Sequence, residues 1–156
     1  MNSSTDIALL RPLVVGVAIT LGTILIHGLA LGAIVTVVRR DLQRGVIGGR
    51  FVTDLIFVTA ALMLAFAAHL LEIALWALVI LRLGEFSSFA TSFYYSAGAY
   101  TTVGSGILMS ARWKLLAPLE GADGMLMFGI STAIIFAVIQ RLVEARYGIA
   151  ENSAWE

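Results

Sequence analysis

The chain lacks several kinds of residue on which soluble and secreted proteins depend. Its 156 residues include no cysteine, which excludes disulfide bonds and thiolate metal sites. Charged residues make up only 13% of the chain, and its basic side chains balance its acidic side chains. A net charge of zero gives no basic surface for nucleic acid, so no nucleic-acid partner is expected.

Hydrophobic residues are abundant instead. They make up 60% of the chain, and the mean hydropathy is +0.96. Three stretches are long and apolar enough to cross a hydrocarbon core about 30 Å thick, at residues 12–38, 52–81 and 124–142. The sequence therefore predicts an all-α membrane protein with three transmembrane helices.

Basic residues predict how the chain is oriented. They gather between the first and second stretches and at the end of the third, at Arg39, Arg40, Arg44, Arg50, Arg141 and Arg146. Because basic loops are retained in the cytoplasm, the N-terminus is expected outside and the C-terminus in the cytoplasm. The protein is expected to be a multi-pass protein of the cell (inner) membrane.

The connection between the second and third stretches holds a distinctive segment. Residues 86–99 predict a helix too short to cross a membrane, with Ser87 or Ser88 as its N-cap. The sequence Tyr-Thr-Thr-Val-Gly-Ser-Gly follows at residues 100–106. Non-helical backbone at membrane depth requires surrounding protein or a water-filled pore, so this arrangement predicts a re-entrant helix and loop. The alternative is a plain extracellular turn, because Gly-Ser-Gly is ordinary turn chemistry.

The order of span, short helix, Thr-Thr-Val-Gly-x-Gly and span resembles the pore module of the potassium-channel superfamily. Residues 93–104 are similar to small bacterial two-transmembrane ion channels, and the resemblance covers residues 67–140. It implies a pore module at residues 51–146, made of outer helix, pore helix, filter and inner helix. Residues 1–50 would then be an extra N-terminal transmembrane helix with a basic cytoplasmic loop, and residues 147–156 a short cytoplasmic tail.

The resemblance also implies a function and its site. Such channels assemble as homotetramers in the bilayer, because one loop supplies only a quarter of each ring of oxygen ligands. The chain would then be a cation channel and not an enzyme, with monovalent cations, K⁺ above all, as permeant ions and no other cofactor. The implied selectivity filter comprises Thr101, Thr102, Val103, Gly104, Ser105 and Gly106, with K⁺ bound at Thr102, Val103, Gly104 and Ser105.

The sequence departs from the family pattern at two positions. Ser105 stands where the family usually has tyrosine or phenylalanine, and Ile107 stands where it usually has aspartate. A serine cannot fill the volume of the aromatic ring that packs against the pore helix. The departures predict a cation pathway whose selectivity for K⁺ is less strict, and they leave open a non-conducting structural or modulatory protein with the channel fold.

The second stretch carries His69 and Glu72, which lie one helical turn apart on the same face. Ionisable groups inside a membrane are costly and are therefore candidates for function. Three interpretations remain open: a structural pair, a proton-sensitive gate, or a metal site completed by His27 or by other subunits. A small membrane enzyme or transporter that uses His69 and Glu72 is the rival from another class.

The sequence also predicts the positions of three further side chains. Trp76 is expected at the membrane boundary, where tryptophan is enriched. Asp123 is expected to cap the N-terminus of the third span, and Glu120 to lie at the surface near the outer mouth.

Overall fold

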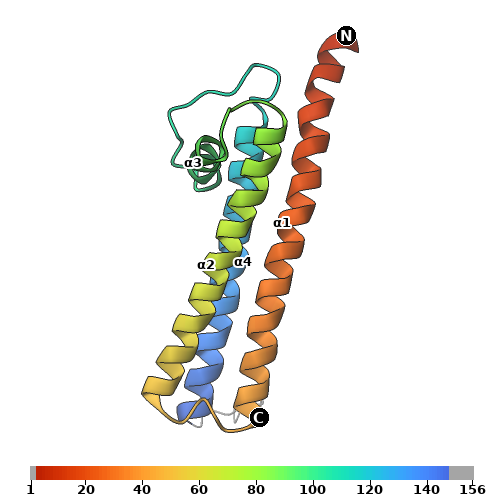
Figure 1. Ribbon diagram of the computed structural model, residues 1–156. Coiled ribbons are helices and arrows are strands. Elements are labelled where there is room, and N and C mark those ends of the chain that lie inside the picture. Colours follow the sequence, from red (N-terminus) through yellow and green to blue (C-terminus); the bar gives the residue numbers. More distant parts are fainter. Residues whose placement is uncertain (1–2, 148–156) are drawn as a thin grey trace. The chain divides into compact units, whose positions relative to one another are not determined.

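The computed structural model describes residues 3–147, and these residues form four α-helices and no strand. The helices follow one another as α1 (Ser3–Gln43), α2 (Phe51–Arg82), α3 (Phe89–Tyr100) and α4 (Leu116–Tyr147) (Figure 1). Three of them are long and apolar enough to cross a membrane, over Leu9–Gln43, Phe51–Arg82 and Leu116–Tyr147. The prediction of three spans and a short fourth helix is confirmed. The predicted tail lies, from residue 148 on, outside the described residues.

The N-terminus of α3 is fixed by a side-chain cap. Ser88 has an extended backbone, and its hydroxyl oxygen accepts a hydrogen bond from the Thr91 amide at 3.1 Å. This bond satisfies an amide that has no partner within the helix, and it confirms the prediction of a cap at Ser87 or Ser88. The helix spans 12 residues, too few to cross a bilayer.

The start of α4 differs from the prediction. The helix begins at Leu116, well before residue 124, so the prediction that Asp123 caps it was wrong. Pro118 lies in the first turn, where a residue without an N–H removes no helical hydrogen bond. Gly121 and Gly124 both lie within this helix, and there it comes close to the end of α3.

The chain divides into two compact units, which are described separately. Unit 1 contains the described residues up to His27 together with Ala68–Phe128, and unit 2 contains Gly28–Ala67 and the described residues from Gly129 on. In unit 1, α3 lies beside the C-terminal part of α2 and the N-terminal part of α4 (Figure 1). Its buried hydrophobic core draws on all four helices and the loop after α3: Ile19, Ile73, Trp76, Ile80, Tyr95, Tyr100, Met109, Trp113, Leu116 and Met127.

Unit 2 has an aliphatic core and a half-buried ion pair. The core comprises Leu31, Ile34, Val38, Ile47, Ala61, Ala65, Ile135, Val138 and Leu142. Asp54 pairs with Arg146 near the end of α4 and accepts a hydrogen bond from the Gly48 amide at 2.7 Å. The same carboxylate therefore fixes the loop between α1 and α2 and the last turns of α4.

Candidate functional site

The loop at residues 101–106 is held against the end of α3 by backbone hydrogen bonds. The amide of Thr101 donates to Ala97 O at 3.2 Å, and the amide of Thr102 donates to Ala99 O at 3.0 Å. The amide of Gly104 donates to Gly98 O at 2.9 Å, so the chain turns back along the helix that precedes it. The direction of α3 therefore sets the direction of the loop.

The dihedral angle φ alternates in sign along this loop. The dihedral angle φ is 62° at Thr102, 81° at Gly104 and 71° at Gly106. Thr102 is the only non-glycine residue with positive φ in the described part of the chain, so Val103 and Ser105 lie on the other side of zero. A backbone that alternates between right- and left-handed regions turns successive amides to one side and successive carbonyls to the other. The left-handed conformation costs a residue such as Thr102 about 1–2 kcal/mol, and strain of this kind collects at functional sites.

The loop presents its backbone to the outside of the monomer. The side chain of Val103 is 83% exposed, and residues 101, 102 and 104 are exposed as well. Among residues 3–147, the carbonyls of Thr102, Val103 and Gly104 accept no hydrogen bond from a backbone amide. Oxygen atoms without such partners are available to coordinate a cation, as the carbonyl rings of ion-channel filters do.

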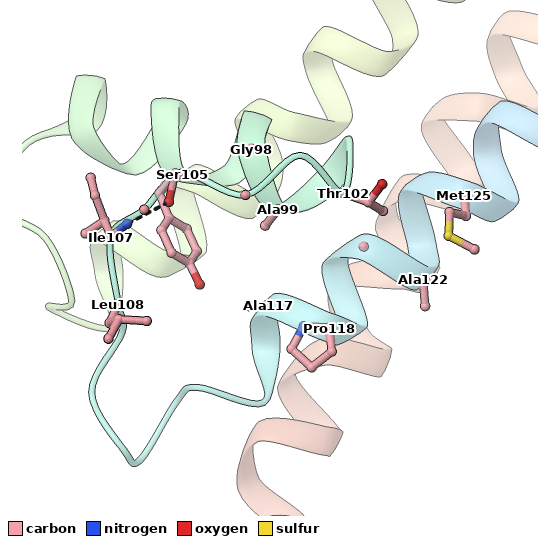
Figure 2. Close-up of a pocket in the computed structure, with 14 residues that line it drawn as sticks. Gly98, Ala99, Thr102, Ser105, Ile107, Leu108, Ala117, Pro118, Ala122 and Met125 are labelled. Carbon is pink, nitrogen blue, oxygen red and sulfur yellow. Dashed lines mark hydrogen bonds between the residues drawn. The ribbon is translucent and has the colours of Figure 1, made fainter.

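Beside the loop lies a groove of about 700 Å³, formed entirely within unit 1 (Figure 2). Residues of α3, the loop and the first turns of α4 line it: Tyr95, Gly98, Ala99, Thr102, Gly104, Ser105, Gly106, Ile107, Leu108, Ala117, Pro118, Gly121, Ala122 and Met125. The Ser105 hydroxyl accepts a hydrogen bond from the Ile107 amide at 3.3 Å, which Figure 2 shows as a dashed line. The small side chain bonds to its own loop and leaves the groove open.

Three glycines allow α3, the loop and α4 to approach one another. A Cβ atom at Gly98 would lie 2.9 Å from both Gly104 C and Ser105 N. A Cβ atom at Gly121 would lie 3.2 Å from Ala99 O, and one at Gly124 would overlap the carbonyl of Tyr100. These roles were not predicted from the sequence, although the spacing of Gly121 and Gly124 places both near one face of a helix.

Comparison with known families identifies the architecture. The family model described as "ion channel" matches residues 55–141, which is more than half of the chain. The chain belongs to this ion-channel family. A search of curated proteins finds no match, and neither does a search of solved structures. The matched residues run from α2 through α3 and the loop into α4, and they form a potassium-channel-like pore module.

Family membership and the three apolar spans make this ion channel a multi-pass membrane protein. The matched region leaves α1 outside it. α1 is nevertheless part of the core of unit 1, where Ile19 is buried and a Cβ atom at Gly22 would lie 2.9 Å from the Leu75 side chain.

Behind the loop, the channel buries a cluster of ionisable side chains. Nδ1 of His27 in α1 lies 2.7 Å from Glu72 Oε1, and Nδ1 of His69 lies 3.3 Å from Glu72 Oε2. The Tyr100 hydroxyl donates to Glu72 Oε2 and lies 3.1 Å from His69 Nδ1. Glu72 has no exposed surface, and the two histidines are 2% and 6% exposed. The structure therefore brings the predicted His69–Glu72 pair together and adds His27 and Tyr100 to it.

Burial, followed by the hydrogen bond to Glu72, raises the pKa of the Tyr100 phenol well above its usual value. The phenol therefore remains a hydrogen-bond donor. Because Tyr100 is the last residue of α3, this bond connects the carboxylate on α2 to the residue at which the loop begins.

A second buried carboxylate lies in the same core. Asp123 accepts hydrogen bonds from Trp76 Nε1 at 2.8 Å and from the Thr23 hydroxyl at 2.9 Å. Trp76 has no exposed surface, so its indole ring faces the core of unit 1 and not the lipid. Its indole nitrogen is needed inside unit 1, where a buried carboxylate requires donors.

Glu120 was also misplaced by the sequence analysis. Its side chain has no exposed surface, and it lies inside α4 and not at the protein surface.

The sequence contains one signal that could have revealed a polar face on α1. Thr23 and His27 stand one helical turn apart in an otherwise apolar stretch.

Proposed function

We propose that this ion channel is a homotetramer that conducts monovalent cations, chiefly K⁺, through a filter formed by residues 101–106. The observation that carries the proposal is the alternation of φ at Thr102, Gly104 and Gly106. Four copies of a loop with this backbone supply successive rings of carbonyl oxygens, which replace the hydration shell of a cation. Residues 102–105 are then the expected K⁺ positions.

The orientation of α3 supports a cation pathway. The partial negative charge of a helix dipole lies at its C-terminal end, and α3 ends at Tyr100, directly before the loop. A cation near this end of the helix is stabilised. The residue directly after Gly106 is Ile107 and not an acidic residue, so the helix end and the carbonyls carry the attraction for the ion.

The groove beside the loop supports assembly with further copies of the chain. Val103 and Leu108 are 83% and 91% exposed in the monomer, although both are apolar and Val103 belongs to the loop. A single loop supplies one quarter of a ring, so the remaining ligands must come from other chains. We propose the same chain as the partner, because closed cyclic symmetry then places four identical loops around one axis.

The preference of the proposed filter for K⁺ over Na⁺ depends on Ser105. Its hydroxyl bonds to the Ile107 amide, and no aromatic ring fills the adjacent groove. With less packing to fix the diameter of the filter, the channel is expected to prefer K⁺ over Na⁺ only moderately. The basic residues before α2 and at the end of α4 favour a cytoplasmic C-terminus and an outward-facing filter in the cell (inner) membrane.

Cation flux from liposomes tests this proposal with a matched pair of variants. The wild-type protein is reconstituted and K⁺ efflux is measured. Gly104→Ala is expected to lose flux, because alanine at φ 81° costs about 1–2 kcal/mol and drives the loop out of its conformation. Gly45→Ala carries the same backbone penalty at φ 67° in the loop between α1 and α2, and a Cβ atom at either position meets nothing within 4 Å.

Flux that persists in Gly45→Ala and disappears in Gly104→Ala supports a filter at this loop. Equal flux in both variants contradicts it. Absence of flux from a confirmed wild-type tetramer favours the rival interpretation, a non-conducting protein with the channel fold, for which the unfilled groove beside Ser105 is the specific observation.

A further inference from the structure

We infer that His27, His69 and Glu72 form a binding site for a divalent transition-metal ion of the Zn²⁺ class, buried inside unit 1 of this channel. This site is separate from the proposed K⁺ positions, which are carbonyl oxygens of the loop. It also uses a residue of α1, which lies outside the region that the ion-channel family model matches.

The chemistry of the three side chains fits such an ion. Two imidazoles and one carboxylate form the ligand set of many zinc sites and of the two-histidine, one-carboxylate iron sites. The chain has only two histidines and no cysteine, and both histidines lie in this cluster. Nitrogen ligands for a transition metal are therefore concentrated at one place in the molecule.

The distances also fit. With metal–ligand bonds of about 2.0–2.1 Å, the ligand atoms around a tetrahedral ion lie about 3.4 Å apart. The two histidine Nδ1 atoms lie 2.7 Å and 3.3 Å from the nearer oxygens of Glu72, and all three ligand atoms lie within 4.8 Å of one another. The longest separation must shorten by at most about 1.4 Å (4.8 minus 3.4), which side-chain rotation can supply. The metal would take the place of protons that the histidines now share with Glu72.

Charge favours a cation at this place. Glu72 and Asp123 are both buried in unit 1, and a buried carboxylate is costly unless it is paired or coordinates a metal. Trp76 stands one helical turn after Glu72 in α2 and donates to Asp123, so the two carboxylates belong to one polar cluster. A divalent cation at the three ligand atoms would offset the negative charge of Glu72 inside the protein.

Neighbouring side chains already restrict the orientation of Glu72 and His69. The Tyr100 hydroxyl donates to Glu72 Oε2, which orients the carboxylate. The Phe128 ring lies 4.4 Å from the His69 ring, centroid to centroid, and limits its rotation. Neighbours of this kind restrict the orientations of the ligands to a few, which favours metal binding after a small rotation of the side chains.

Metal content and Co²⁺ absorption test the inference. The full chain is expressed in medium supplemented with Zn²⁺, purified through a tag without histidine and without chelators, and analysed for metal by mass spectrometry. Separately, metal-free protein is titrated with Co²⁺, whose visible absorption reports tetrahedral coordination. We expect about one metal ion per chain and a loss of affinity of about 100-fold or more in His27→Gln, His69→Gln and Glu72→Gln.

Glutamine at either histidine position keeps a hydrogen-bond donor for Glu72, so these variants are expected to fold, and their elution volume and thermal midpoint check this. Glu144→Gln removes a carboxylate from the outer face of α4 and is expected to leave metal binding unchanged. Wild-type protein that holds no metal by either route overturns the inference. So does metal that remains in the His27→Gln/His69→Gln double variant, because such metal is adventitious. These experiments measure metal binding and not ion flux, so their outcome is independent of whether the protein conducts.

Discussion

Replacing Gly98 by alanine is expected to displace the proposed filter, although Gly98 belongs to α3 and not to the filter itself. A Cβ atom at this position lies 2.9 Å from Gly104 C and from Ser105 N, and 3.0 Å from Gly104 O. Ordinary contacts between carbon atoms begin near about 3.5 Å, so the loop must move by about 0.6 Å. All three atoms are backbone atoms, which cannot rotate away as the end of a side chain would.

The free-energy balance of this change has three parts. Overpacking of this kind costs about 1–3 kcal/mol, and loss of the hydrogen bond from Gly104 N to Gly98 O costs about 1 kcal/mol. Alanine in place of glycine within a helix returns about 1 kcal/mol. The net cost of about 1–3 kcal/mol lowers the equilibrium constant between the intact and the displaced loop about 5- to 150-fold.

Flux from liposomes and the thermal midpoint in detergent measure these effects. Gly28→Ala is the matched control, because this helical glycine in α1 is exposed and a Cβ atom there meets nothing within 4 Å. We expect Gly98→Ala to lose about fivefold or more in K⁺ flux, and Gly28→Ala to keep its flux with an unchanged or higher midpoint. Normal flux through Gly98→Ala would refute the claim that conduction requires the loop to be packed against α3.

Three further predictions concern caps, ion pairs and selectivity. Ser88→Ala is expected to destabilise the protein by about 1 kcal/mol through loss of the α3 cap, and Ser87→Ala by much less; equal thermal midpoints would contradict the role of the cap. Arg146→Gln, which breaks the half-buried ion pair of unit 2, is expected to cost about 1–3 kcal/mol, whereas Arg141→Gln, which breaks an exposed pair, should cost under about 0.5 kcal/mol; the reverse order of thermal midpoints would argue against this account. Ser105→Tyr is expected to raise the ratio of K⁺ to Na⁺ flux by filling the groove beside the loop, and an unchanged ratio would show that this side chain does not set selectivity.

Length, hydropathy and local capping chemistry were enough to predict the elements of the fold. The three spans follow from apolar stretches long enough to cross a bilayer, and the cap at Ser88 follows from a serine placed before a short helix. The family match confirms the resemblance that the order of span, short helix, loop and span indicated.

Some features could not be predicted from the sequence because they depend on contacts between helices. Asp123 was predicted to cap a helix, but its carboxylate accepts hydrogen bonds from Trp76 and from Thr23, which is 100 residues away in the chain. His27 joins Glu72 across a separation of 45 residues, whereas helical spacing reveals only partners on the same helix. The start of α4 was predicted too late because the prediction followed the apolar stretch, whereas the helix begins before that stretch, at Leu116.

Recording currents in planar bilayers, with K⁺ on one side and Na⁺ on the other, tests the central claim most directly. The account predicts a cation current whose reversal potential favours K⁺ moderately and which Gly104→Ala abolishes. An anion current, or no current from a protein shown to be tetrameric, would contradict the assignment of residues 101–106 as a cation-selective filter.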